Sequence, residues 1–83
     1  MDENEEEFLP ASPERIAESL RARRKELMLT QAEIAGLAGL LPKTVSALEN
    51  SPKRCSLESL LKLCSFLGLE ISLTPRPPRA GKE

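Results

Sequence analysis

Besides its 13 carboxylates, this 83-residue chain carries basic, hydroxyl and amide side chains that could do chemistry. The chain has no histidine and only two cysteines, Cys55 and Cys64. A closed zinc site needs four ligands, and an enzymatic nucleophile needs a neighbouring base. We therefore expect no metal, no cofactor and no enzyme activity. Cys64 is predicted to be a small core residue, and Cys55 is predicted to have no chemical role.

Most candidate binding residues lie in the stretch LTQAEIAGLAGLLPKTVSALEN, residues 29–50, which follows the basic run RARRK at residues 21–25. The stretch contains two short helical patterns joined by a glycine-containing turn. Two helices that meet at a steep angle through a tight turn are one way of presenting a helix to the major groove of DNA. We call the second pattern the reading helix, and its outward-facing residues are Lys43, Thr44, Ser46 and Ala47.

Caps and apolar spacing predict the helix before this stretch. Its N-cap is Ser12, with Pro13 at the first helical position, where a missing N–H costs nothing. Ile16, Leu20 and Leu27 recur at helical spacing and predict the buried face. The basic side chains mostly face away from that stripe and are expected to be solvated; they are Arg15, Arg21, Arg23 and Lys25.

The same signals place the two helices of the central stretch. Thr30 is a suitable N-cap for a helix over residues 31–38, in which Ile34 and Leu37 should face inward. Gly39 supplies the turn, because glycine adopts a left-handed backbone at little cost. The reading helix should run from about residue 42 to about residue 49, with its buried side formed by Val45 and Leu48.

A fourth helix and one strand complete the prediction. Ser56 can cap the helix, Gly68 ends it, and its apolar stripe is Leu57, Leu60, Leu61, Cys64 and Leu67. The period then changes from 3.6 to 2, which predicts a strand over residues 69–74 with one face formed by Leu69, Ile71 and Leu73. A lone strand in a helical chain lacks a partner, so we expect pairing with a second copy in a homodimer. The alternative is an extended tail that packs on its own domain.

Charge divides the chain into a domain and two ends. Residues 1–8 carry five acids and no base, so the remainder has a net charge of +4. We expect a disordered acidic arm over residues 1–11, a helix-turn-helix domain over 12–68, the dimer strand over 69–74 and a flexible basic tail over 75–83. The arm either solubilises the protein or screens a basic surface. No apolar run approaches the ~18 residues that span a bilayer, so we expect a cytoplasmic protein without a membrane partner.

The run L-T-Q-A-E-I-A-x-x-A-G, followed by T-V-S-A-L-E-N, resembles the phage-repressor-like, or Xre-type, helix-turn-helix family over about residues 15–67. The spacing E-N-S-P-K-R-C-S-L and the ending L-G-L-E-I-S-L-T most resemble HipB-type antitoxins. This resemblance implies a mostly α fold of four to five helices, with one C-terminal strand that pairs across a homodimer. It also implies repression of the protein's own operon through operator DNA, and a HipA-type serine/threonine kinase toxin as partner.

The resemblance also assigns residue roles. Gln31 matches the residue at a helix start that contacts a phosphate, and its neighbours Thr30 and Ala32 are further DNA-binding candidates. Arg24 and Glu49 match a structural salt bridge. The positions that face the groove are Lys43, Thr44 and Ala47, and those of the loop that meets the DNA backbone are Lys53 and Arg54.

The chain departs from the family pattern at the start of the reading helix. Relatives commonly place polar residues at the two positions occupied here by Leu41 and Pro42. Neither side chain can hydrogen-bond a base edge, although apolar contact with thymine methyls remains open.

The sequence leaves three functions open: an autoregulating antitoxin repressor, a solitary phage-type repressor, and a module that neutralises a kinase mainly by direct binding.

Overall fold

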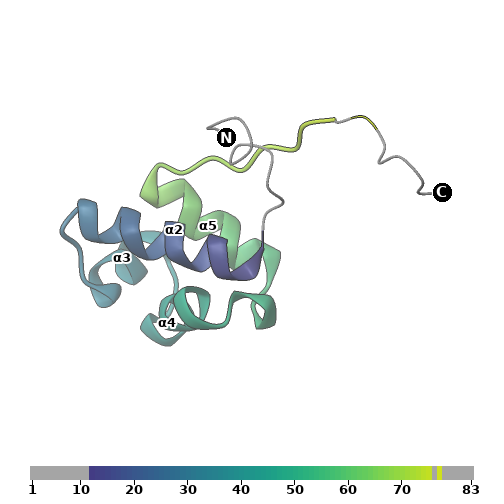
Figure 1. Ribbon diagram of the computed structural model, residues 1–83. Coiled ribbons are helices and arrows are strands. Elements are labelled where there is room, and N and C mark those ends of the chain that lie inside the picture. The colour runs from purple at the N-terminus through teal and green to yellow at the C-terminus, as the bar shows by residue number, and fades with distance from the viewer. Residues whose placement is uncertain (1–11, 76, 78–83) are drawn as a thin grey trace.

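The computed structural model describes residues 12–75 and residue 77. Within them the chain forms α2 (Pro13–Glu26), α3 (Gln31–Ala38), α4 (Pro42–Asn50), the 3-10 turn η1 (Pro52–Arg54) and α5 (Leu57–Leu67). Figure 1 shows α2 across the middle of the domain, with α4 below it and α5 beside it. The predicted helical fold is confirmed. The acidic arm and most of the basic tail lie outside the described residues.

Local side-chain chemistry starts three of the helices where the sequence predicts. The Ser12 hydroxyl accepts a hydrogen bond from the backbone N–H of Arg15, and Ser56 begins α5 in the same way. Thr30 and Glu33 form a reciprocal capping box at the start of α3, each side chain accepting from the other's backbone N–H at 3.0 and 2.8 Å. These bonds satisfy backbone donors that have no partner inside a helix.

Backbone conformation ends two of the helices. Gly39 follows α3 with φ +71°, and Gly68 follows α5 with φ +73°. Both adopt the left-handed conformation that glycine accepts without a Cβ clash. The end of α2 is different, because the positive φ of 61° there belongs to Met28, a side chain exposed to solvent.

The core lies where the four α-helices meet. Its buried members are Leu20, Ile34, Ala35, Val45, Leu48, Leu63, Cys64 and Leu67. The predicted burial of Cys64 is confirmed, and Leu60 packs against this cluster as a partly buried residue.

Several predicted core positions are wrong. Leu37 is 58% exposed, because α3 buries the small Ala35 and Ala38 instead. Leu37 and Ala38 are neighbours in sequence and therefore point about 100° apart around the helix. Leu57 and Leu61 are also exposed, as they lie beside the buried stripe of α5. Leu27 is 39% exposed, because α2 ends one residue before it.

Residues 69–75 have no regular secondary structure in the single chain. Leu69 packs against the core, whereas Ile71 and Leu73 are 50% and 95% exposed. No strand occurs within residues 12–75, so the fold class is confirmed only for its helices. A β-ladder needs a second segment, and pairing between two copies stays a prediction.

Among the residues with a described placement, no helix is both long and apolar enough to cross a membrane.

Candidate nucleic-acid interface

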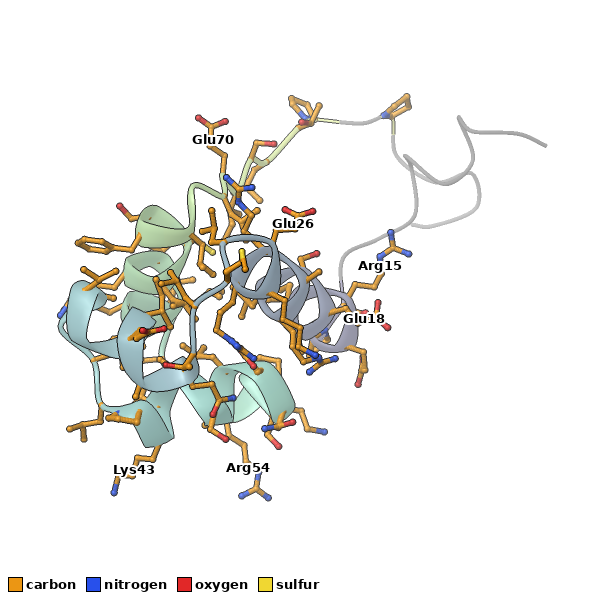
Figure 2. All side chains as sticks on the ribbon, turned by 90° about the vertical axis from the view of Figure 1, so that its left-hand side faces the viewer. Arg15, Glu18, Glu26, Lys43, Arg54 and Glu70 are labelled. Atoms are coloured by element: carbon orange, nitrogen blue, oxygen red, sulfur yellow. The ribbon has the colours of Figure 1, made fainter. Side chains whose placement is uncertain are left out.

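The reading helix α4 is buried on one side and open on the other. Val45 and Leu48 are completely buried, and this fixes the rotation of the helix on the domain. Lys43 is exposed on the opposite side, while Thr44 and Ala47 are half-buried. Figure 2 shows Lys43 projecting away from the domain. An ammonium and two small side chains thus lie where a groove of DNA could meet them.

The turn η1 adds two cations next to α4. Lys53 and Arg54 follow the reading helix directly and are both exposed. Arg54 projects to the same side of the domain as Lys43 (Figure 2). The predicted loop is thus a short 3-10 turn, begun by Pro52 and closed by a backbone hydrogen bond from Cys55 to the Pro52 carbonyl. Cations on this side favour contact with phosphates.

The start of α4 is apolar. Leu41 is the N-cap residue, is 59% exposed and makes no side-chain capping bond, and Pro42 occupies the first turn. Pro42 has no N–H. The backbone N–H groups of Thr44 and Val45 donate to the Leu41 carbonyl at 2.9 and 3.2 Å. The side chains of Leu41 and Pro42 offer only carbon surface, so they can touch a thymine methyl but cannot hydrogen-bond a base.

The start of α3 lies against the end of α4. The Thr30 hydroxyl accepts a hydrogen bond within the capping box, and Ala32 is exposed. The amide Nε2 of Gln31 donates to Oε1 of Glu49 at 3.0 Å, a contact that the sequence did not predict. Helix N-termini favour anions, which supports a phosphate near Thr30, Gln31 and Ala32.

A salt bridge links α2 to the end of α4. Arg24 Nε donates to Glu49 Oε2 at 2.6 Å, and Arg24 Nη2 donates to Glu49 Oε1 at 3.1 Å. Glu49 is only 1% exposed. Burial raises the pKa of the Glu49 carboxyl, but hydrogen bonds from Arg24 and Gln31 and the charges of Arg24 and Arg21 outweigh it and hold that pKa below its usual value. The pKa of Arg24 is raised, chiefly by its hydrogen bond to Glu49.

Two further arginines of the basic run are structural. Arg21 donates from Nη1 to the backbone carbonyl of Glu49, and Arg23 donates from Nε to the Leu67 carbonyl at 2.8 Å. The expectation that both are solvated is wrong, because each reaches a carbonyl at the end of another helix. Arg15 and Lys25 are exposed, as expected. The basic run therefore joins α2 to α4 and α5, and the exposed cations of the candidate interface lie on α4 and η1.

The match to a family model covers the same part of the chain. The model is described as helix-turn-helix and matches residues 20–73, which include α3, α4 and η1. The chain belongs to the helix-turn-helix family. As a helix-turn-helix domain it has a DNA-binding fold. In such folds the second helix of the motif is the one that reads the major groove, and α4 holds that position in this chain.

This helix-turn-helix chain is similar to known antitoxins. It is 32% identical over 62 residues to the antitoxin HipB of Escherichia coli O6:H1, a match that covers 75% of this chain and 66% of that relative. A chain of a HipA-HipB-O2-O3 complex superimposes with a TM-score of 0.75 at 28% identity, covering 83% of this chain and 97% of that chain. A chain of a HipB-O4 20mer complex gives a TM-score of 0.74 at the same identity and coverage.

Proposed function

We propose that the chain is a sequence-specific transcriptional repressor that binds operator DNA as a homodimer and is the antitoxin of a HipA-type kinase toxin. The observation that carries the proposal is the exposed face of α4 and η1, where Lys43 and Arg54 project to one side of a helix-turn-helix domain. The similarity to HipB chains found in complexes with HipA and with a 20mer supports both partners.

Each part of the interface has a distinct role in this proposal. Lys43 donates to guanine in the major groove, and the methyl groups of Thr44 and Ala47 contact thymine. Lys53 and Arg54 contact the phosphate backbone, as does Gln31 at the start of α3. Direct readout rests on few residues, so DNA shape and dimer symmetry supply the remaining specificity.

The C-terminal segment provides the contact between the two copies of the homodimer. Leu69, Ile71 and Leu73 form one face of a strand that pairs with its counterpart in the partner chain. Two reading helices then meet half-sites one helical turn apart, because a two-fold dimer matches a palindromic site.

The test uses the purified chain and the DNA upstream of its own gene. Footprinting should protect two half-sites about one helical turn apart, roughly 10 base pairs, with an affinity that falls steeply as salt rises. Protection without this spacing, or equal affinity for random DNA, would contradict the repressor proposal.

The toxin partnership is tested separately with a kinase encoded beside the gene. The antitoxin proposal expects the chain to bind that kinase and to repress the shared promoter. Repression without kinase binding would identify a solitary repressor, whereas loss of kinase activity in the absence of DNA would show direct neutralisation.

A further inference from the structure

The buried carboxylate of Glu49 joins three helices at the end of the reading helix. It accepts from Arg24 of α2 through both oxygens, and its Oε1 also accepts from Nε2 of Gln31 at the start of α3. Glu49 is 1% exposed, and every buried side-chain nitrogen and oxygen of the described residues has a hydrogen-bond partner. A salt bridge to Arg24 alone would not require the contact with Gln31.

This contact fixes the orientation of the Gln31 amide. An ionised carboxylate can only accept hydrogen bonds, so it must face the amide nitrogen of Gln31 and not the carbonyl oxygen. The low pKa of Glu49 keeps the carboxylate ionised, and Arg24 balances its charge. Nε2 carries two hydrogens, of which Glu49 takes one. Within residues 12–75 Gln31 makes no second side-chain hydrogen bond.

We propose that Glu49 is a positioning residue for DNA binding, which orients the Gln31 amide so that its second N–H donates to a backbone phosphate. Phosphate oxygens are acceptors, and a reversed amide would turn its carbonyl oxygen toward them. The arrangement couples the fold of the domain to one contact with the DNA backbone. The inference rests on the proposed DNA-binding function.

The variant Glu49→Gln tests the orientation. Its side-chain oxygen can replace only one of the two carboxylate oxygens, and the shortest contact, from Arg24 Nε at 2.6 Å, favours the Oε2 position. The NH2 group then stands at Oε1, where it faces Arg24 Nη2 and Gln31 Nε2. Two NH2 groups cannot bond each other as donors, and the Gln31 amide must therefore reverse.

The affinity of the full chain is measured on its operator and on random DNA for wild type, Glu49→Gln, Gln31→Met and the double variant. Glu49→Gln should weaken both complexes about tenfold, because a phosphate contact is not sequence-specific. It should cause no further loss in the Gln31→Met background. The loss of one negative charge is common to both backgrounds and cancels in the cycle. An equal loss in both backgrounds would show a purely structural role and overturn the proposal.

The free protein provides a second readout. Gln31 is the only glutamine of the chain, so its side-chain amide gives a single pair of NMR signals of that type. In wild type, one of the two amide protons should exchange slowly with solvent. The chemical shifts of both protons should change when Glu49 is protonated. If both protons exchange freely and their chemical shifts do not change as Glu49 titrates, the proposal is overturned, even if Glu49→Gln fails to fold. Failure of wild type to bind any DNA would instead refute the proposed function.

Discussion

At the scale of single residues, position relative to the core decides which cations are available to DNA. Arg21, Arg23 and Arg24 are neighbours in a basic run, yet each donates to an acceptor on another part of the chain. Lys43 and Arg54 lie outside this run and are exposed in the structure. The density of positive charge along the sequence is therefore a poor guide to the binding surface of this domain.

Replacing Lys43 with alanine should lower operator affinity by ~1–3 kcal/mol if the ammonium donates to a base. The loss should be greater on operator than on random DNA, and fluorescence anisotropy with both fragments measures it. Lys62 offers a matched control, because its ammonium is also exposed but lies on α5, where it is next to Glu58 of the same helix. An equal loss on both fragments would make Lys43 a phosphate contact.

Replacing Arg24 with methionine should reduce the free energy of unfolding at neutral pH by about 3 kcal/mol, since it leaves Glu49 buried without its main partner. The Glu49 pKa is lowered in the folded state, so its ion pair stabilises the protein above the ordinary pKa of 4.5 and is lost as pH falls through the folded pKa. The difference between variant and wild type should shrink on acidification.

Urea unfolding at pH 7 and pH 3 measures the free energy of unfolding of wild type and of Arg24→Met. The exposed Arg15 on the same helix is the control, and Arg15→Met should change stability little at either pH. A deficit of Arg24→Met that is the same at both pH values would contradict this account of the ion pair.

At the scale of elements, backbone conformation at the helix ends determines how α3 and α4 meet. Gly39 has a positive φ, and the capping box fixes the opposite end of α3. Together they confine α3 to eight residues, which bring Gln31 against Glu49. The end of α2 shows that a non-glycine residue can also have a positive φ. Met28 does so, and its side chain is exposed to solvent.

Gly39→Ala should destabilise the domain by about 1–2 kcal/mol, the cost of a left-handed backbone for a residue with a Cβ. A Cβ at this position meets no atom within 4 Å, so the loss would come from the backbone alone. Gly36→Ala is the control, because Gly36 lies inside α3 with equally open space. It should stabilise by about 0.5–1 kcal/mol. Thermal unfolding at one protein concentration should move the two variants in opposite directions.

At the scale of the whole molecule, the single domain leaves apolar surface uncovered along its C-terminal segment. Leu69 packs on the core, whereas Ile71 and Leu73 beyond it are exposed. The segment also borders a groove that Ile16, Leu20 and Cys64 help to line. Pairing of two copies would cover this face and add ladder hydrogen bonds to the segment.

Ile71→Asp should convert the dimer to a monomer at micromolar concentration, because a charge would enter the shared apolar face without a partner. Operator affinity should fall with it. Ser72→Asp places the same charge on the opposite face of the predicted strand and should leave the dimer intact. Sedimentation measures the mass of both variants. A dimeric Ile71→Asp variant would refute the strand interface, whereas a monomeric wild-type protein would favour the extended tail.

The sequence by itself determined the local structure. Ser12, Thr30 and Ser56 cap their helices, and Gly39 and Gly68 end theirs, because caps and turns depend on residues within one or two turns of the chain. The motif around α3 and α4 could also be predicted. Helical periodicity predicted that Lys43, Thr44 and Ala47 face outward, whereas only the resemblance implied the pair Arg24–Glu49 and contact with the groove.

Only the tertiary structure decided the contacts between helices. Arg23 reaches the Leu67 carbonyl across 44 positions of sequence, and Gln31 reaches Glu49 across 18. Such pairs depend on how far each helix is rotated on the core. That rotation also exposed Leu37 and turned the small Ala35 and Ala38 of α3 into the domain. Helical periodicity predicts a buried stripe, but the packing of neighbouring helices sets its centre.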